Sequence, residues 1–380
     1  MKRTFYGLMA LLCLLTTSAH AAGEPVPLTL SASAALLMEK TTGTILYEQD
    51  AHTLYEPASV TKVMTLLLVM EAIDNGTLGW EDQVTASARA CSMGGSQIWL
   101  KERETLTVRD MVKAVTVASA NDCSVALAEH LAGSEEAFVA RMNQRAHQLG
   151  MEHTTFLNCT GLPATGHLTC AHDIALMSRE LILHHPAIRE FTTIWMDTLR
   201  DGQFQLTNTN KLVRSFEGIT GLKTGSTDGA LYCISATAER EGMELIAVIL
   251  HAPTPDQRFN DAKALLSYGF SQYTLLPVYP DQVIPPVPVM LGEADAVQPV
   301  ANRPCAVLIP RTQVGQIRTQ VEVAPSVEAP VEPGQRLGRL QVYAGEQLLD
   351  SIDLVADLPV PRLSFWGIFR QLLDTLLMTG

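Results

Sequence analysis

The stretch Pro57-Ala58-Ser59-Val60-Thr61-Lys62 stands at the start of a long apolar run and is the point from which the fold can be worked out. Ser59 and Lys62 are three residues apart, so on a helix they lie on one face, one turn from each other. A serine hydroxyl is a poor nucleophile unless a nearby base removes its proton. A lysine one turn away can be that base if burial or a second cation suppresses its charge. Because Ser-x-x-Lys alone is a weak signal, its meaning depends on the rest of the chain.

The helix that begins near Ser59 is expected to be buried on every side. Pro57 suits the first turn of a helix, and Asp74-Asn75-Gly76 supplies a stop. Apolar side chains between them fall on nearly all helix faces, at Val60, Val63, Met64, Leu66, Leu67, Leu68, Val69 and Met70. A helix of this kind lies in a core. Ser59 would then stand where the core reaches a cleft.

The flanking segments predict an α+β domain over about residues 24–272. Strands are expected at 34–38, 44–48, 231–238 and 243–251, where the apolar pattern has a period of two. Helices are expected at 108–118, 123–131, 135–149, 172–184 and 258–268, with a loop at 156–169. Strands at both ends and helices in the middle indicate an antiparallel sheet completed by distant segments.

The C-terminal part has a different composition. Prolines cluster from residue 277 and indicate a linker, and short β-type runs then predict a small all-β domain ending near 358. The last stretch, 362–380, reads as an amphipathic helix with aromatic residues at its start, which can lie on a membrane surface but not span it. Its polar face is barely basic, so a terminal helix packed on its own protein or in a dimer is the alternative.

Composition and the N-terminal residues limit the classes of protein to which the chain can belong. The chain has 380 residues, 47% of them hydrophobic, which is typical of a globular protein with room for two domains. A formal net charge of −13 argues against a nucleic-acid partner, because binding phosphates needs a basic face. Residues 1–21 have a basic start, an apolar core and an Ala19-His20-Ala21 cleavage pattern, so we expect a secretory signal peptide rather than a short anchor. The mature protein would then work outside the cytoplasm, at the outer face of the cytoplasmic membrane.

The cysteines leave their pairing open. Loss of the signal would leave six of the seven, at Cys91, Cys123, Cys159, Cys170, Cys233 and Cys305. Six cysteines allow 15 complete pairings, and most could equally be buried free thiols. Cys123 could lie near the cleft as a free thiol or pair with a partner such as Cys159. The chain has no C-x-x-C pair, and no metal or cofactor is expected.

Two further motifs follow Ser59-x-x-Lys62 along the chain. They are Ser119-Ala120-Asn121 and Lys223-Thr224-Gly225. This trio in this order is found in penicillin-binding proteins and, with aspartate in the middle motif, in class A β-lactamases. The chain resembles the low-molecular-mass penicillin-binding proteins, which are serine-type D-alanyl-D-alanine carboxypeptidases. The resemblance covers nearly the whole chain, including the second domain and the terminal helix, and implies the fold shared by β-lactamases and penicillin-binding transpeptidases.

The resemblance also implies catalytic roles. Ser59 would attack the peptide bond between the two terminal D-alanines of a peptidoglycan stem peptide, with Lys62 as the general base. The pKa of Lys62 would be lowered by partial burial and by the cation Lys223. Ser119 would relay a proton to the leaving amine, and Asn121 would hold Lys62 and a substrate amide.

The third motif would bind the substrate. Lys223 and Thr224 would receive the terminal carboxylate, and Gly225 would let the substrate approach the backbone. The backbone N–H groups of Ser59 and Ser226 would form the oxyanion hole. Penicillin and other β-lactams would mimic the substrate and leave Ser59 acylated.

Two departures from relatives are noted. Ser226 stands where some relatives carry histidine, and we expect this to tune rate or pH dependence. Arg258 is expected at a solvent-exposed helix start rather than beside the site.

Three other functions stay open. A class A β-lactamase would carry Ser-Asp-Asn in the middle motif and a glutamate in the 156–169 loop, which has no acidic residue here. A transpeptidase would act on the same stem peptides and differ only in the acceptor. A non-catalytic wall-binding scaffold would use the second domain and the terminal helix as its working parts.

Overall fold

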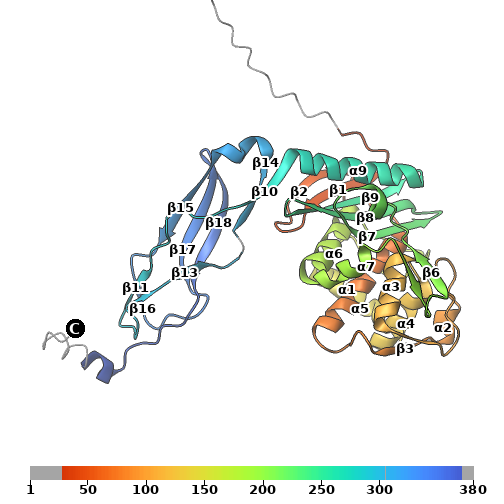
Figure 1. Cartoon of the computed structure of the whole chain (residues 1–380), viewed down its shortest axis with the longest axis horizontal. Coiled ribbons are helices and arrows are strands. Elements are labelled where there is room, and N and C mark those ends of the chain that lie inside the picture. The colour runs from red at the N-terminus through yellow and green to blue at the C-terminus, as the bar shows by residue number, and fades with distance from the viewer. Residues whose placement is uncertain (1–27, 304, 370–380) are drawn as a thin grey trace, which may run out of the picture.

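The structure is a computed structural model that describes residues 28–303 and 305–369. The predicted signal peptide, 1–21, lies outside the described residues. Figure 1 shows a larger part that contains a sheet with helices on both faces and a smaller all-β part that follows it in the chain.

The larger part is built on a five-stranded antiparallel sheet whose strand order is β2-β1-β9-β8-β7. Its strands are β1 (Ala34–Glu39), β2 (Ile45–Gln49), β7 (Ile219–Thr227), β8 (Leu231–Arg240) and β9 (Met243–Ala252). β1 pairs with β9, more than 200 residues later, so the two ends of this region share one sheet. The α+β prediction with a sheet completed by distant segments is confirmed.

Alternating strand residues supply the two faces of this sheet. Leu36 packs into the large core with the central helices, whereas Leu37 packs on the opposite face against Phe259 and Leu265 of α9 (Pro255–Gln272). Figure 1 shows α9 on one side of the sheet and the other main helices on the opposite side. The site motifs lie on or beside the side that carries the larger core.

The predicted helices are present with ends shifted by a few residues. The bounds are α1 (Lys62–Asp74), α3 (Val108–Val117), α4 (Asn121–Ala132), α5 (Glu135–Gln148) and α6 (Ala171–His184). Several short elements were not predicted because three or four residues carry too little periodicity. They are α2 (Ala88–Cys91), α7 (Arg189–Thr192) and α8 (Leu212–Ser215), the 3₁₀ turn Pro186–Ile188, and the two-stranded pairs β3 (Gln83–Thr85) with β4 (Thr105–Thr107) and β5 (Met196–Leu199) with β6 (Phe204–Thr207).

The helix at the first motif has two parts. Ala58–Thr61 forms a 3₁₀ turn, η1, and α1 begins only at Lys62. Nine of the 13 residues of α1 are buried, Lys62 included, as the all-round apolar pattern predicts. Ser59 therefore belongs to a tighter turn than the α-helix that was expected.

The smaller part is all β, as predicted. The β-type runs were expected at 307–310, 321–323, 339–344 and 348–354. Each lies within a strand: β14 (Ala306–Pro310), β15 (Ile317–Val323), β17 (Arg336–Ala344) and β18 (Gln347–Ala356). Others were not predicted: β10 (Tyr273–Pro277), β11 (Val287–Met290), β12 (Ala296–Val297), β13 (Pro299–Ala301) and β16 (Val327–Glu328). The proline-rich stretch that we expected to be a linker thus contributes β11, whose Val287 and Val289 are buried in a small core.

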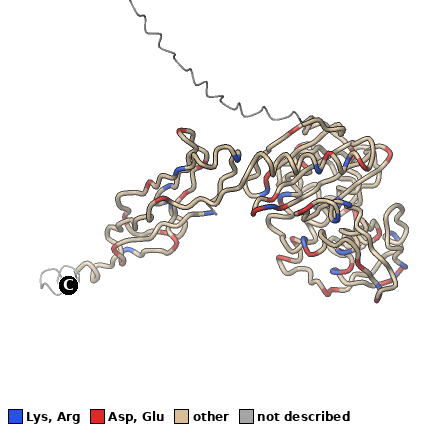
Figure 2. The backbone as a smooth tube through the Cα atoms, turned by 45° about the horizontal axis from the view of Figure 1, so that its top comes forward, with Lys and Arg blue, Asp and Glu red and all other residues tan. Residues whose placement is uncertain are grey.

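The last features are the distribution of charge and the C-terminal end of the described chain. Acidic and basic residues are interspersed along both parts of the chain (Figure 2). Residues 365–369 are helical, whereas residues 362–364 of the predicted terminal helix are not, and residues 370–380 lie outside the described residues. Among the residues that the structure covers, no helix has the length and apolarity needed to cross a membrane.

Candidate active site

Ser59 and Lys62 are in direct contact. The Lys62 Nζ donates hydrogen bonds to Ser59 Oγ at 2.9 Å and to the Thr160 carbonyl oxygen at 2.7 Å. Lys62 is fully buried, whereas Ser59 is partly exposed. The residue before the nucleophile, Ala58, has a φ of 46°, a left-handed conformation that non-glycine residues adopt at a cost and that is common at functional sites. The turn thus holds the serine at the surface and the lysine in the core.

Burial lowers the pKa of Lys62 to about 7, because the charged ammonium loses its hydration in the core. Cys159 and Asp122 oppose this shift. Lys223, which we expected to lower the pKa of Lys62, is not among the causes of this shift. Burial, Lys62 and Arg258 instead lower the pKa of Lys223 well below its usual value.

The second motif lies where α3 ends and α4 begins. Ser119 has a φ of 64° and Asn121 is the first residue of α4. The Ser119 Oγ and Asn121 Oδ1 atoms are buried and have no hydrogen-bond partner among the described residues. Unpaired buried polar atoms are uncommon and need an explanation such as an absent ligand. The Ser119 hydroxyl can therefore donate or accept a hydrogen bond to a bound molecule, and Asn121 Oδ1 can accept one.

Asn121 does not hold Lys62 as expected. Its Nδ2 donates to the Gly94 carbonyl oxygen at 2.7 Å, and its backbone N–H donates to Ser96 O at 2.7 Å. The lysine is held instead by the Thr160 carbonyl, since no Asn121–Lys62 bond is found in residues 28–303 and 305–369. Asn121 thus fixes the 94–96 loop beside the site.

The third motif lies on β7, the edge strand of the sheet. Gly225 packs against the first motif so closely that a Cβ there would stand 2.9 Å from the Ser59 nitrogen and 3.0 Å from the Pro57 carbonyl oxygen. Lys223 and Thr224 are buried, and the Thr224 hydroxyl donates to Thr209 Oγ1 at 2.7 Å. The structure therefore brings the first and third motifs together. The roles expected for Lys223 and Thr224 and for the exposed Ser226 stay predictions.

A second glycine was not singled out from the sequence. Gly161 has a φ of 83°, and a Cβ there would stand 1.7 Å from the Ala58 carbonyl oxygen. It follows Thr160, whose carbonyl binds Lys62. The 156–169 loop thus completes the site through its backbone. No side-chain motif in the sequence predicts such a contact.

Arg258 is buried beside the third motif, contrary to expectation. We expected it to be solvated, but it is 7% exposed and its Nη1 donates to the Gly225 carbonyl oxygen at 3.2 Å. Its guanidinium lies over the Phe259 ring, 4.4 Å from the centroid, and burial lowers its pKa to about 10. Its Nε has no partner among the described residues. The arginine therefore places a buried cation directly behind the third motif.

Asp122 is another residue that sequence reasoning missed. It is fully buried and accepts backbone N–H bonds from Ile98 at 3.1 Å and Leu100 at 3.0 Å. These bonds tie the loop before α3 to the start of α4, next to Ser119 and Asn121. The sequence signal that could have pointed to Asp122 is its place directly after Ser119-Ala120-Asn121.

Among the described residues, the structure shows whether the cysteines form disulfides. All six cysteines there are free thiols, and both Cys123 and Cys159 are buried. The Cys159 thiol faces Glu135 Oε1 at 3.5 Å. The alternative of a Cys123–Cys159 disulfide is not found.

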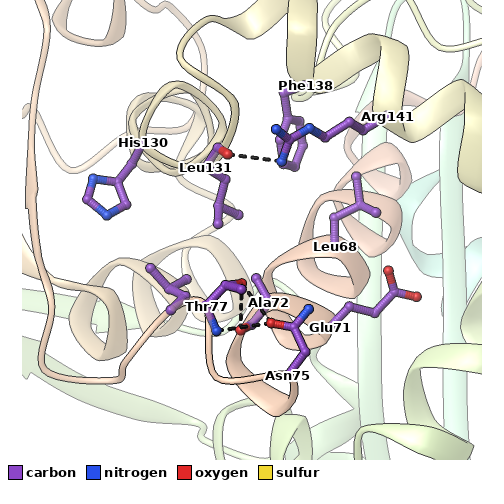
Figure 3. Close-up of a pocket in the computed structure, with 10 residues that line it drawn as sticks. Leu68, Glu71, Ala72, Asn75, Thr77, His130, Leu131, Phe138 and Arg141 are labelled. Atoms are coloured by element: carbon purple, nitrogen blue, oxygen red, sulfur yellow. Dashed lines mark hydrogen bonds between the residues drawn. The ribbon is translucent and has the colours of Figure 1, made fainter.

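A separate cavity lies at the other end of α1. It has a volume of about 420 Å³ and is lined by residues of α1, α4 and α5, among them Glu71, His130 and Arg141. Figure 3 shows Arg141 turned toward the Leu131 carbonyl oxygen, which accepts its hydrogen bond at 2.9 Å. None of the motif residues lines this cavity.

Comparisons with known proteins agree with this geometry. Residues 18–254 match the D-alanyl-D-alanine carboxypeptidase family, and residues 273–362 match the C-terminal domain of penicillin-binding protein 5. The D-alanyl-D-alanine carboxypeptidase DacF of Bacillus subtilis is 40% identical over 326 residues, covering 84% of each chain.

Solved structures give the same result. Penicillin-binding protein 5 from Haemophilus influenzae superposes with a TM-score of 0.78 at 27% identity, covering 89% of this chain and 100% of that one. The ampicillin-bound penicillin-binding protein D2 from Listeria monocytogenes has a TM-score of 0.59 at 37% identity over 64% of this chain and 99% of that one. The expected penicillin-binding fold is thus confirmed, and the chain belongs to the D-alanyl-D-alanine carboxypeptidase family of serine-type hydrolases.

Proposed function

We propose that the chain removes the terminal D-alanine from peptidoglycan stem peptides through an acyl-enzyme on Ser59. The observation that carries this proposal is the 2.9 Å contact between Ser59 Oγ and the buried Lys62 Nζ. With a pKa of about 7, Lys62 is neutral in a large fraction of molecules near neutral pH. A neutral amine can accept the Ser59 proton, which a fully charged lysine cannot do.

Acylation then follows from the arrangement of the first and third motifs. Ser59 Oγ attacks the carbonyl carbon of the penultimate D-alanine while Lys62 takes its proton. The negative charge that develops on the carbonyl oxygen is received by the backbone N–H groups of Ser59 and Ser226. Each donor of this kind contributes about 3 kcal/mol to catalysis. The close packing of Gly225 on the Ser59 nitrogen supports this pairing of N–H groups.

The second motif serves the leaving group. Breaking the peptide bond requires a proton on the departing amine, and Ser119 Oγ is a buried hydroxyl with no other partner among the described residues. We assign the relay of the proton from Lys62 to this hydroxyl. Asn121 Oδ1, also unpaired, accepts an N–H bond from the substrate backbone. Water then hydrolyses the ester and regenerates Ser59.

Specificity for a free C-terminus comes from buried cations. A substrate carboxylate near Lys223 restores the proton that burial disfavours, so binding and charging of this lysine are coupled. Arg258, which bonds the Gly225 carbonyl, adds positive potential from behind the strand. A substrate without a terminal carboxylate gains neither interaction. The same site accepts β-lactams, by analogy with the ampicillin-bound relative.

The test is release of D-alanine from diacetyl-L-lysyl-D-alanyl-D-alanine by the purified protein. Wild type is expected to release one D-alanine per peptide, and Lys62→Ala is expected to lose at least about 100-fold in rate, typical of removing a general base. Lys101→Ala, at an exposed lysine, is the matched control and keeps full activity. A wild-type protein that releases no D-alanine but labels with penicillin would favour a transpeptidase. Absence of both reactions would favour a scaffold.

The lifetime of the penicilloyl adduct on Ser59 distinguishes a carboxypeptidase from a β-lactamase. The 156–169 loop has no acidic residue to activate the deacylating water, which favours slow hydrolysis of the penicilloyl ester. Intact-mass spectra after mixing with penicillin are expected to show a long-lived adduct. Rapid turnover of penicillin without an adduct would support the β-lactamase.

We also propose that the protein is exported and held at the outer face of the cytoplasmic membrane. The basic, apolar and small-residue pattern of 1–21 supports export. The aromatic and leucine face of 362–380 supports a helix lying on the membrane surface. Phe365 and Trp366, both more than 70% exposed, belong to this face.

A further inference from the structure

A cluster of histidine and cysteine side chains lies outside the motifs. The side chains of His52, His153 and Cys170 each offer one ligand atom, and these three atoms all lie within 4.8 Å of one another. His52 and His153 are exposed and Cys170 is buried beneath them. We propose that this cluster is a binding site for one Zn²⁺ ion or a similar thiophilic divalent metal ion.

The donor set fits this class of ion. Zn²⁺ takes imidazole nitrogen at about 2.0–2.1 Å and thiolate sulfur at about 2.3 Å, so ligand atoms in a tetrahedral site are roughly 3.5 Å apart. The cluster has to contract by roughly 1 Å, which the two exposed imidazoles can achieve by side-chain rotation. Water occupies the fourth position. Hard cations such as Ca²⁺ and Mg²⁺ prefer oxygen and are disfavoured here.

The backbone around the cluster is already fixed. The His172 N–H donates to the Ala51 carbonyl oxygen at 3.0 Å, and Tyr55 and Thr169 exchange backbone hydrogen bonds at 2.8 and 2.9 Å. In the chain, the bonded residues Ala51 and Tyr55 stand on either side of His52. Likewise, Thr169 and His172 stand on either side of Cys170. A site with preorganised ligands loses less entropy when the metal binds.

Asp173 fixes the third ligand. It is fully buried in the first turn of α6, and its Oδ2 accepts hydrogen bonds from the backbone N–H of His153 at 2.8 Å and from the Thr154 hydroxyl at 2.8 Å. Its Oδ1 lies 3.3 Å from Nδ1 of His172, whose ring packs on His52 with centroids 4.7 Å apart. Asp173 therefore positions the backbone of His153 and the His172 ring that packs on His52.

Binding exchanges a proton for the metal. Cys170 is a buried free cysteine, whose sulfur carries a proton as a thiol. Metal binding forms the zinc–sulfur bond and releases this proton to solvent, with no change of oxidation state. Cys170 is the N-cap of α6, and the positive end of that helix favours the thiolate once it forms.

The site would join three segments that support the nucleophile. His52 lies seven residues before Ser59, His153 precedes the loop that carries Thr160, and Cys170 follows it. Metal binding is therefore expected to stabilise this part of the fold. At a zinc concentration 100 times Kd we expect Tm to rise by roughly 5 °C or more.

The experiment uses the full chain, reduced and freed of metal, with Zn²⁺ in equilibrium dialysis and Co²⁺ as the spectroscopic probe. We expect one ion per chain and a thiolate-to-cobalt charge-transfer band together with the visible bands of tetrahedral Co²⁺. Cys170→Ser should abolish the charge-transfer band. Each of Cys170→Ser and His52→Ala should weaken zinc binding by at least about 100-fold, because losing even an outer-shell partner costs 10–100-fold.

The controls separate this site from adventitious binding. Cys91→Ser and His184→Ala remove a thiol and an exposed imidazole elsewhere and should leave binding unchanged. His52 is exposed, so His52→Ala tests the proposal even if Cys170→Ser fails to fold, as checked by circular dichroism. Binding of less than one ion per chain, or binding that His52→Ala leaves intact, would overturn the proposal.

Discussion

Among single residues, Lys62 matters most, because burial lowers its pKa and lets it act as a base. The sequence predicted burial correctly, because apolar side chains surround the lysine on all helix faces. It could not predict the Thr160 carbonyl that binds Nζ, because backbone groups have no signature in a sequence. It also misjudged Arg258, whose burial under Gly225 and Phe259 depends on packing between α9 and the edge of the sheet.

Acylation of Ser59 should follow the titration of Lys62. With a pKa of about 7, the neutral fraction falls tenfold for each pH unit below that value. The acylation rate by penicillin should therefore rise with pH and level off above about 8. Lys62→Arg, which stays charged, should lose at least about 100-fold and show no rise near neutrality. Stopped-flow acylation from pH 5 to about 9, with Lys101→Arg as the control, checks this. A flat wild-type profile would contradict it.

Lys223→Gln should separate binding from proton transfer. Losing a charge-assisted bond to the substrate carboxylate costs about 1.5–3 kcal/mol, so kcat/KM for the peptide should fall by roughly 10–100-fold. Since Lys223 is not among the causes that lower the Lys62 pKa, the pH midpoint of acylation should stay in place. Peptide kinetics and the penicillin pH profile, measured on one preparation, give both readouts. A midpoint displaced upward would restore the role in Lys62 chemistry that the sequence suggested.

At the scale of elements, the site depends on segments that touch through backbone. β7 and the 156–169 loop meet η1 at Gly225 and Gly161, so three distant segments surround Ser59. Periodicity and turn residues predicted the long helices and the sheet, because those patterns extend over many residues. The 3₁₀ turn and the short elements were missed because their few residues leave no periodic pattern.

Gly161→Ala should damage both stability and activity. Its Cβ would stand 1.7 Å from the Ala58 carbonyl oxygen in a backbone at φ 83°, so the loop or η1 must move. We expect a loss of roughly 3 kcal/mol or more in the free energy of unfolding and a large drop in acylation.

Gly166→Ala is the matched control in the same loop. Its φ is 94°, but the nearest atom to its Cβ would be a leucine methyl at 3.8 Å. It should cost only about 1–2 kcal/mol, the cost of the left-handed conformation, and keep acylation near wild type. Denaturant unfolding and penicillin labelling measure both variants. Equal effects of the two substitutions would show that the contact with Ala58 is unimportant.

At the scale of the whole molecule, the chain combines the catalytic fold with an all-β C-terminal domain, and both match known families. The boundaries 24–272 and 277–358 stay predictions, as do export and membrane attachment. Composition shifts located the second domain, yet they could not show that β10 pairs with β14 or that β11 lies within the proline-rich stretch. Those pairings depend on contacts between segments that share no local pattern.

Deleting residues 363–380 should free the protein from membranes without changing catalysis. The apolar face of this segment would supply the membrane affinity, and the segment is more than 100 residues beyond the last motif. Cell fractionation with penicillin labelling of each fraction measures location and activity together. Unchanged partition into the membrane fraction would point to packing of the helix on its own protein or in a dimer.

We expect Ser59, with Lys62 as its base, to form the acyl-enzyme. Intact-mass spectrometry after incubation with penicillin, followed by peptide mapping, tests it most directly. Wild type and Ser226→Ala, which keeps its backbone N–H, should each gain one penicilloyl group on the peptide containing Ser59. Ser59→Ala, folded by circular dichroism, should gain none. An adduct on Ser59→Ala, or a wild-type adduct on another residue, would contradict the account.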